Sequence, residues 1–355
     1  MANFCVLSNY VNPVLLKTDG ASCNCSLFDY HDKSYIVSRS VSYTKCGKHS
    51  FLYKGRCHTT NYLYSMDKSY NLQKLKVLSS PHYECLYYKY NGLEDIRVIK
   101  WAGSLYFLGT RVLGDSDKGT MCFGRLVNLE LCDITEVPTT QLREKNWMPI
   151  ESMPFCCIYS MRPYKLINVK SREFMELVGG LPDNFSGSSP IVPYKDGLFI
   201  SVVHKRNSNN DYLHYFVVYN SDLSIKTISQ PFSFFGSKIE FCVTLKVLPK
   251  GVLLLPSVND GLSYAFEIPD YMVQRIVDGA MGDATCDPCV YDRFYADAKS
   301  INAPEVAASM AVMATNPKYI SEAIIYNHTK SSYSIGERAH RQKLLLSNFY
   351  KYVKR

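Results

Sequence analysis

The stretch EDIRVIKWAGSLYFLGTR, residues 94–111, joins a polar cluster to two apolar runs that are separated by the turn residues AGS. Runs of β-branched and aromatic residues bounded by turn residues predict strands. Glu94, Asp95 and Arg97 therefore stand at the head of a predicted buried strand. Because adjacent strand residues point to opposite faces, Glu94 and Asp95 are not expected to share a face.

The same arrangement recurs five times along the chain, each time as a small polar cluster followed by a strand, a turn and a second apolar strand. The clusters are NCS (24–26), EDIR (94–97), EKNW (144–147), SGSSP (186–190) and IEFC (239–242). Their spacing suits one four-stranded propeller blade each, with loops of variable length. The innermost strand of a blade lines the central channel, so the clusters are predicted to converge on one mouth of that channel.

The fold class follows from how strand-like and helix-like segments are distributed. From about residue 20 to 265 short strand-like runs alternate with turn residues, which indicates an all-β sandwich, barrel or propeller. Beyond about residue 268, PEVAASMAVMATNPKYISEAIIYN and residues 336–353 have helix-like spacing. We expect a five-bladed β-propeller over residues 1–267 and a mainly helical C-terminal extension over 268–355.

Composition indicates a globular chain, with 46% hydrophobic and 20% charged residues. No window approaches the roughly 18 uninterrupted apolar residues of a membrane span. The start MANFCVLSNYVNPVLLKTDG lacks the basic and apolar regions of a secretory signal. We therefore expect a cytoplasmic protein without a membrane partner, with a virion as the alternative location.

The 13 cysteines are scattered and odd in number, which predicts buried thiols in a reducing compartment. Cys23 with Cys25, and Cys286 with Cys289, are close pairs. A structural zinc site needs two pairs at compatible spacing, so we expect no metal.

The net charge is +8, and part of the excess comes from the end, ERAHRQKLLLSNFYKYVKR. The simplest interpretation is a solvated helix face. Without an aromatic–basic motif we do not expect nucleic-acid binding. The alternative is that the extension carries an interaction surface, for a protein partner or for a second copy of the chain.

Four motifs, taken together and in order, resemble a known family. They are EDIR (94–97), KNW (145–147) with SMRP (160–163), GSSPI (187–191) with GLFISVVH (197–204), and VND (258–260). This series resembles the five-bladed β-propeller glycosidase superfamily, in particular glycoside hydrolase family 130, the mannoside phosphorylases, and related propeller mannosyltransferases. The resemblance covers about residues 24–265.

The resemblance implies roles for residues at the matching positions. Asp95 corresponds to the general acid that donates a proton to the glycosidic oxygen. The basic positions that hold sugar or inorganic phosphate are Arg97, Lys145, Arg162 and His204. The sugar-contacting positions are Asn24, Arg39 and Asp260. Glu94 is a further channel-mouth residue. Glu240 is a candidate second carboxylate, and the alternative is that it only lines the channel. No cofactor is implied, and inorganic phosphate is a candidate co-substrate.

Three departures from the pattern leave two functions open. EDIR lacks the family's proline, SMR replaces HR, and Ser186 stands where related propellers usually have an arginine. The first function is an enzyme that cleaves or forms a glycosidic bond on a mannose-like sugar, by phosphorolysis or glycosyl transfer. The second is an inactive propeller that binds sugar or serves as a structural scaffold, in a viral particle for example. Basic residues that converge around Asp95 in an open pocket would favour the enzyme. A filled channel, or an Asp95 held fast by its neighbours, would favour the scaffold.

Overall fold

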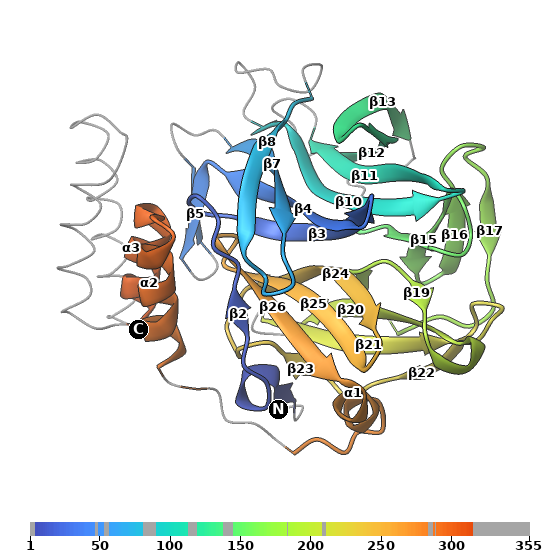
Figure 1. The fold of residues 1–355 in the computed structure, drawn as a ribbon. Coiled ribbons are helices and arrows are strands. Elements are labelled where there is room, and N and C mark those ends of the chain that lie inside the picture. Colours follow the sequence, from blue (N-terminus) through green and yellow to red (C-terminus); the bar gives the residue numbers. More distant parts are fainter. Residues whose placement is uncertain are drawn as a thin grey trace.

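The computed structural model describes residues 4–46, 49–52, 57–80, 90–112, 119–137, 145–182, 184–207, 211–282, 287 and 289–314. Their strands form five sheets and one separate hairpin. Most strands in each sheet follow one another in the chain and pair antiparallel, so each sheet is built largely from one continuous stretch (Figure 1).

The first two sheets use the N-terminal part of the chain. The first contains β3 (Cys23–Tyr30), β4 (Lys33–Val41), β7 (Cys57–Met66) and β8 (Leu72–Leu78), with β9 (Tyr90–Asn91) parallel to β7. The second contains β10 (Leu93–Trp101), β11 (Ser104–Val112), β12 (Gly119–Val127) and β13 (Glu130–Val137). The separate hairpin is β5 (Tyr43–Cys46) with β6 (His49–Leu52).

The other three sheets follow in chain order. The third contains β14 (Met148–Pro149), β15 (Cys156–Met161), β16 (Tyr164–Asn168) and β17 (Phe174–Glu176). The fourth contains β18 (Phe185–Gly187), β19 (Val192–Pro193), β20 (Phe199–Arg206), β21 (Tyr212–Tyr219), β22 (Ile225–Ile228), β23 (Phe232–Ser233) and β1 (Cys5–Val6). The fifth contains β24 (Glu240–Leu248), β25 (Gly251–Val258), β26 (Leu262–Pro269) and β2 (Val14–Leu15). Short 3₁₀ turns cover Leu7–Asn9 and Lys195–Gly197.

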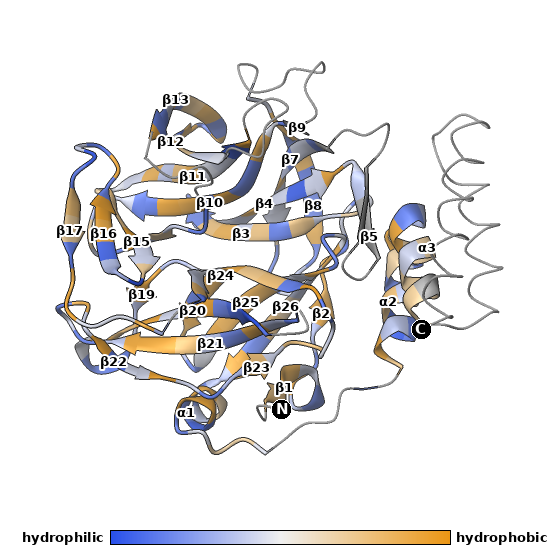
Figure 2. Cartoon of the chain, turned by 180° about the vertical axis from the view of Figure 1, so that it is seen from behind, coloured by the Kyte–Doolittle hydropathy of each residue, from blue (hydrophilic) through white to orange (hydrophobic). Residues whose placement is uncertain are grey.

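Apolar side chains join the sheets into a closed ring. Among the described residues, five buried apolar clusters each lie between two neighbouring sheets. Between the second and third sheets, Trp101 packs in one cluster with Trp147 and Ile167. Between the fifth and first sheets, Leu253 packs with Ile36, which closes the ring. Figure 2 shows apolar residues recurring along the strands of every sheet, as expected for sheets packed on both faces.

The N-terminal strands β1 and β2 join the fourth and fifth sheets, whose other strands come much later in the sequence. Val14 and Leu15 of β2 pair with Ala265 and Tyr264, which makes β2 the outer strand of the fifth sheet. β1 pairs parallel with β23 at the edge of the fourth sheet. The two ends of the strand-rich region are therefore held together by backbone hydrogen bonds.

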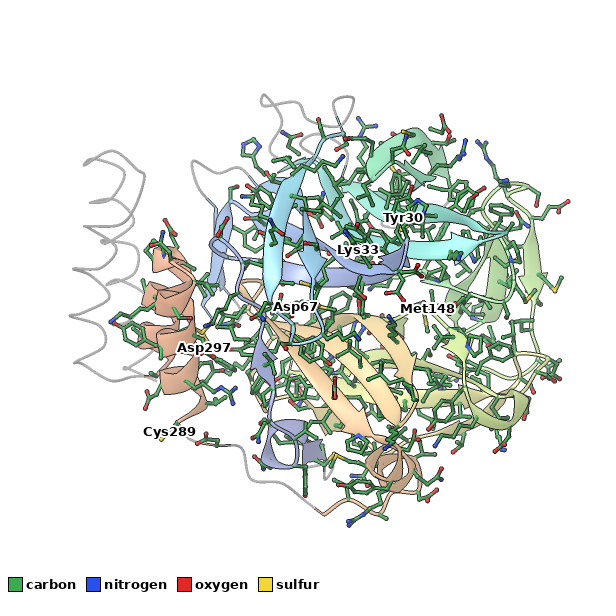
Figure 3. All side chains as sticks on the ribbon, in the orientation of Figure 1. Tyr30, Lys33, Asp67, Met148, Cys289 and Asp297 are labelled. Carbon is green, nitrogen blue, oxygen red and sulfur yellow. The ribbon has the colours of Figure 1, made fainter. Side chains whose placement is uncertain are left out.

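Three helices follow the last sheet. α1 (Asp270–Val277) packs on β25 and β26, while α2 (Val290–Ser300) and α3 (Pro304–Met313) lie beside β5 (Figure 1). Asp297 is on the side of α2 that faces the sheets, and its carboxylate accepts a hydrogen bond of 2.7 Å from the Tyr264 hydroxyl (Figure 3). α3 is buried on nearly all sides, as its Ala- and Met-rich sequence suggests.

The mainly β class and the propeller arrangement are confirmed, and helices follow the sheets. The helix predicted over residues 336–353 and the basic C-terminal end lie outside the described residues. The division at residue 267 stays a prediction.

Candidate active site

The five polar clusters mark the starts of the innermost strands. NCS, EDIR and IEFC open β3, β10 and β24, EKNW directly precedes β14, and SGSSP spans the end of β18 and the link to β19. Inner strands β24, β3 and β10 lie next to one another. Because these strands belong to neighbouring sheets, their polar first residues come together at one end of the ring.

β-Bulges turn two of these first residues out of the regular alternation. The pairing register of β3 shifts between Cys23 and Ser26, and that of β10 shifts between Glu94 and Arg97. The residues at the shifts, Asn24 and Asp95, have φ of +52° and +53°. A bulge re-aims the side chain it carries and is frequent beside active sites. The prediction that Glu94 and Asp95 point to opposite faces is therefore wrong.

Arg39 of β4 joins both carboxylates. Its Nη1 lies 2.8 Å from Asp95 Oδ1 and its Nη2 lies 2.9 Å from Glu94 Oε1. Asn24 Nδ2 donates a second hydrogen bond, of 2.5 Å, to the same Asp95 oxygen. Ser257 Oγ in turn donates to Asn24 Oδ1 at 2.8 Å. The structure thus brings four predicted site residues, Asn24, Arg39, Glu94 and Asp95, into one buried group.

The two carboxylates differ in proton affinity. Burial raises the pKa of Asp95, but three cations and the Asn24 hydrogen bond lower it by more, so that it lies below the ordinary value. The cations are Arg39, Arg97 and Lys145. Burial and the neighbouring Asp95 charge raise the pKa of Glu94 against the attraction of Arg39 and Lys145. The Glu94 side chain is also the more exposed, at 22% against 11% for Asp95.

Arg97 lies behind Asp95 and is 1% exposed. Its Nε donates to the Ser188 carbonyl at 3.2 Å and its Nη1 to the Asp95 carbonyl at 3.3 Å. Among the described residues its Nη2 has no hydrogen-bond partner and is out of contact with solvent. Arg97 therefore links the second sheet to the start of the fourth from inside the protein.

His204 of β20 is also inside, at 5% exposure. Its Nδ1 lies 2.8 Å from Ser188 Oγ, and its ring stacks on Tyr212 with centroids 5.4 Å apart. Burial lowers the pKa of His204 well below the usual value, and the positive charges of Lys145, Arg206 and Arg97 act in the same direction. The imidazole is therefore neutral at pH 7. Ser188 contacts both His204, through its hydroxyl, and Arg97, through its carbonyl.

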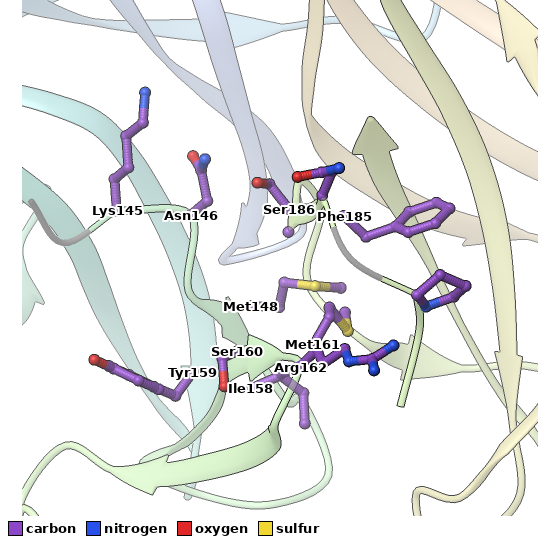
Figure 4. A pocket seen from close by; sticks show the side chains of 13 residues that line it. Lys145, Asn146, Met148, Ile158, Tyr159, Ser160, Met161, Arg162, Phe185 and Ser186 are labelled. Atoms are coloured by element: carbon purple, nitrogen blue, oxygen red, sulfur yellow. The ribbon is translucent and has the colours of Figure 1, made fainter. Parts of the chain in front are cut away.

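Lys145 and Arg162 line a cavity of about 180 Å³ between the third and fourth sheets. Lys145 precedes β14, and Arg162 occupies the turn between β15 and β16, before the cis-proline Pro163. Figure 4 shows them on different sides of the cavity, with Met148 and Met161 between them and Ser186 at its edge. Both cations are exposed. Lys145 lines this open space and also acts electrostatically on both carboxylates.

Glu240 is fully buried at the start of β24 and is closed off by the turn that precedes it. Its two oxygens accept five hydrogen bonds of 2.7–3.0 Å. The donors are the Ser233 hydroxyl, the Phe234 and Phe235 amides, and the amide and hydroxyl of Ser237. These contacts make Glu240 an anchor of the turn, in place of the predicted channel-lining contact with substrate.

Asp260 lies in the turn between β25 and β26, and its Oδ2 accepts a hydrogen bond of 2.7 Å from the Tyr43 hydroxyl. Burial raises the pKa of Tyr43 well above its usual value, so the phenol stays protonated. Tyr43 was not among the predicted site residues. It follows Arg39 by four positions in one extended run, and this even spacing was the available signal that both share a face.

The described residues contain no group of three or more His, Cys, Asp or Glu side chains that could hold a metal ion. Cysteines with described side chains are free thiols, most of them buried. Cys289 is exposed, and its partner in sequence, Cys286, lies outside the described residues. No helix within the described ranges is long and apolar enough to cross a membrane.

The geometry can support acid chemistry at one end of the ring. A carboxyl group whose pKa is raised, beside one whose pKa is lowered, is the arrangement by which paired carboxylates can take different roles. The exposed cations Lys145 and Arg162 can attract an anion to the neighbouring cavity.

Neither a family model nor a curated protein sequence matches this chain. Solved structures do match. The β-1,2-mannobiose phosphorylase from Listeria innocua superposes with a TM-score of 0.54 at 10% identity, over 76% of this chain and 98% of its own. A glycosyl hydrolase from Bacteroides ovatus gives 0.53 at 11% identity, over 76% and 96%.

A third match comes from the GH130 family of mannoside phosphorylases, which contains glycoside hydrolases that target β-1,2 mannosidic linkages in Candida mannan. It gives a TM-score of 0.53 at 10% identity, over 73% of this chain and 89% of its own. The resemblance to the propeller glycosidase superfamily is thus confirmed at the level of the fold. At these identities the matches establish the fold alone.

Proposed function

We propose that the chain is a carbohydrate-active enzyme that cleaves or forms a glycosidic bond of a mannose-like sugar, by phosphorolysis or glycosyl transfer. The five sheets would be the five blades of a glycosidase-type propeller over residues 1–267, with residues 268–355 as a helical extension. The fold shared with a mannobiose phosphorylase supports the sugar class. The reaction takes place at the end of the ring where Glu94 and Asp95 meet.

The observation that carries the proposal is the split within the carboxylate pair. Departure of the glycosidic oxygen needs a carboxylic acid that is still protonated near neutral pH. Glu94 has the raised pKa and the greater exposure, whereas Asp95 is held ionised by Arg39 and Asn24. This supports Glu94 as the proton donor, with Asp95 orienting Arg39. Asp95 as the acid, the role implied by the family resemblance, stays a prediction.

Lys145 and Arg162 would hold the anionic co-substrate. Their cavity of about 180 Å³ is below the usual range of about 300–1,000 Å³ for ligand pockets, which favours a small ion or part of one sugar ring. Inorganic phosphate fits both the charge and the size. Arg97 and His204 would hold neighbouring residues in place without contacting the substrate, because both are buried.

A second candidate is a propeller that binds sugar without chemistry. It is favoured by the shielding of Asp95, whose side chain is 11% exposed and bonded to Asn24 and Arg39, and by the burial of Arg97. An Asp95 that is fixed by hydrogen bonds to its neighbours favours this candidate over the enzyme. Binding without turnover is the result that would establish it.

The test is a phosphate-release and phosphate-uptake assay with β-1,2-mannobiose and with mannose 1-phosphate plus mannose. We expect phosphate-dependent turnover in the wild type and a loss of about 10²–10⁴-fold in Glu94→Gln, the usual contribution of a general acid. Arg162→Ala should raise the KM for phosphate with a smaller effect on kcat, because its cation is held near the ion.

Lys165→Ala is the control, since Lys165 is a cation of β16 paired with Glu176 and does not line the cavity. Full activity in Glu94→Gln together with its loss in Asp95→Asn would return the acid role to Asp95. Absence of turnover, with mannobiose binding retained in calorimetry, would establish the sugar-binding propeller instead.

A further inference from the structure

A second cavity, of about 310 Å³, lies between the first and second sheets. It is larger than the cavity beside Lys145 and falls within the usual range of about 300–1,000 Å³ for ligand sites. Its walls come from the ends of β3 and β10, whereas Asn24 and Asp95 lie near the starts of these strands. Because a strand rises about 3.3 Å per residue, the two places are roughly 20 Å apart. The cavity is therefore separate from the candidate active site.

Three tight hairpin turns form the walls of this cavity. They join β3 to β4 at residues 30–33, β10 to β11 at 101–104, and β12 to β13 at 127–130. In each turn both central residues have φ between +47° and +78°, as in two-residue type I′ hairpins. Figure 3 shows Tyr30 and Lys33, which close the first of these turns. Such turns leave the backbone little freedom, so the cavity needs little ordering when a ligand binds.

One side of the cavity is apolar. Leu105 and Leu126 line it and are 7% and 4% exposed, and both belong to the buried cluster between the first and second sheets. The half-buried Tyr30 packs on the same cluster, and the centroid of its ring lies 4.0 Å from that of His31. An aromatic ring beside aliphatic side chains offers a flat apolar surface on which the C–H groups of a sugar ring can pack.

Ion pairs offset charge around the cavity. Asp29 Oδ1 accepts a hydrogen bond of 2.7 Å from the Ser34 hydroxyl, and its Oδ2 lies 2.6 Å from Lys246 Nζ. Arg125 Nη1 lies 3.5 Å from Asp133 Oδ2. Each oxygen of Asp29 keeps a lone pair that can accept a further hydrogen bond. The carboxylate is thus neutralised and still able to bind a hydroxyl group.

Lys100 is the remaining cation of the lining, and it acts electrostatically on the carboxylates of Asp29 and Glu151. Within this set of charged groups, cations and carboxylates are equal in number, so neither an anion nor a cation is favoured as the ligand. Among the described residues the side chains of Lys100, Ser104 and Asn128 make no hydrogen bond, and all three line the cavity and are exposed. Their donors and acceptors are available to a ligand.

We propose that this cavity is a second sugar-binding site, which takes one neutral pyranose ring of a saccharide and catalyses no reaction. The ring packs on Tyr30, and its hydroxyl groups bond to Lys100, Asp29 and Asn128. A hydroxylated ring with an apolar face suits these groups, because each hydroxyl both donates and accepts. The inference goes beyond the proposed function and does not depend on it. A saccharide held here leaves the other end of the ring of sheets free for the reaction.

The test follows leucine methyl signals by NMR while β-1,2-mannobiose, the probe of the assay above, is added. The signals of Leu105 and Leu126 are assigned by Leu105→Ile and Leu126→Ile, which conserve side-chain volume. We expect both signals to shift and to saturate. Lys100→Ala should weaken this binding about tenfold, because a hydrogen bond to a charged group is lost. Tyr30→Leu should weaken it as well, because it removes the ring and keeps an apolar side chain.

Lys33→Ala is the matched control, since Lys33 is an exposed lysine of the same turn that does not line the cavity. It should bind as the wild type does. Arg162→Ala should also leave the two leucine shifts unchanged, because Arg162 lines the other cavity. Circular dichroism checks the fold of each variant. If Tyr30→Leu does not fold, Asn128→Ala takes its place, because Asn128 is an exposed turn residue.

The proposal is overturned if neither signal moves at the highest soluble concentration of mannobiose, or if Lys100→Ala binds as tightly as Lys33→Ala. It is also overturned if inorganic phosphate moves the signals and the neutral sugar does not, since the cavity would then be an anion site. The titration needs no turnover, so an inactive protein with saturable shifts would refute the proposed function and leave this inference standing. Binding that is lost in Lys100→Ala belongs to this cavity, and binding that is lost in Arg162→Ala belongs to the other one.

Discussion

Glu94 and Asp95 are neighbours in the chain and share one guanidinium, and yet burial and charge shift their pKa values in opposite directions. The cause is geometric, because the bulge at Asp95 lets both carboxylates reach Arg39. Asp95 accepts two strong hydrogen bonds on one oxygen, whereas Glu94 pairs with Arg39 Nη2. At the scale of residues, the pair therefore separates into one carboxylate with a lowered pKa and one with a raised pKa.

This separation predicts different dependences of stability on pH. The folded-state pKa of Asp95 is lowered, so its ion pair contributes stability that is present above its unfolded pKa of about 3.9 and is lost as pH falls through the folded pKa. Asp95→Asn should cost about 3–5 kcal/mol at pH 7, the usual loss when one partner of a buried pair is removed. This cost should stay constant between pH 5 and 8.

The contribution of Glu94 to stability depends on pH with the opposite sign. Its folded-state pKa is raised, so its ionisation opposes folding as pH rises above the unfolded value of about 4.3. Glu94→Gln should therefore gain stability relative to the wild type as pH increases from about 4. Urea unfolding of both variants and the wild type at several pH values measures this, and parallel pH profiles for the two variants would contradict the assignment.

At the scale of elements, the inner strands depend on close backbone contacts between neighbouring sheets. Gly187 ends β18, and a Cβ there would lie 2.2 Å from the Asn146 carbonyl oxygen and 2.4 Å from Met148 Cγ. The fourth sheet thus meets the segment ahead of β14 through a glycine. Asn146, Met148 and Gly187 all line the cavity that contains Lys145 and Arg162.

Gly187→Ala should therefore destabilise the protein by about 1–3 kcal/mol, the usual cost of overpacking, because backbone and not a flexible side-chain end must move. Thermal unfolding checks this. Gly282→Ala is the matched control, because a Cβ there meets nothing within 4 Å, and it should stay within about 0.5 kcal/mol of the wild type, as expected for an open surface site. Equal effects of the two substitutions would show that the contact is looser than the distances indicate.

At the scale of the whole molecule, the ring is closed by segments far apart in sequence. β2 completes the fifth sheet, and Leu16 is fully buried in the cluster between the fifth and first sheets. Leu7 is buried between the fourth and fifth sheets. The N-terminal residues are thus part of two interfaces of the ring.

Removing residues 1–16 should lower the free energy of unfolding by several kcal/mol, since burying one leucine side chain is worth about 1.5–3 kcal/mol and strand pairing is lost as well. The midpoint of thermal unfolding and the urea slope measure the effect. Removal of residues 1–3 alone leaves β1 and β2 in place and serves as the control. An unchanged midpoint after removal of residues 1–16 would mean that the ring does not depend on this closure.

The recurring polar clusters and the apolar runs after them were sufficient to predict the all-β class, the propeller arrangement and the starts of the inner strands. These patterns predict the strands because hydrophobic alternation, turn residues and strand length are local properties that are encoded within about ten residues. The five clusters also located most of the residues that surround the carboxylate pair. EDIR predicted that Glu94, Asp95 and Arg97 stand at the head of an inner strand, but the expectation that Glu94 and Asp95 point to opposite faces was wrong.

Only the tertiary structure decided what each polar residue does. Glu240 and Glu94 are both glutamates near the starts of inner strands, but five donors from the preceding turn enclose the first, while Arg39 and Asp95 flank the second. Asp260 meets Tyr43 across 217 positions of sequence, and Asn24 meets Asp95 across 71. Hydrogen-bond partners and electric fields depend on distance in space, which a periodic pattern does not encode. The sequence by itself therefore determined the architecture and where the polar clusters lie along the chain. The folded structure determined the direction in which the pKa of each carboxylate shifts.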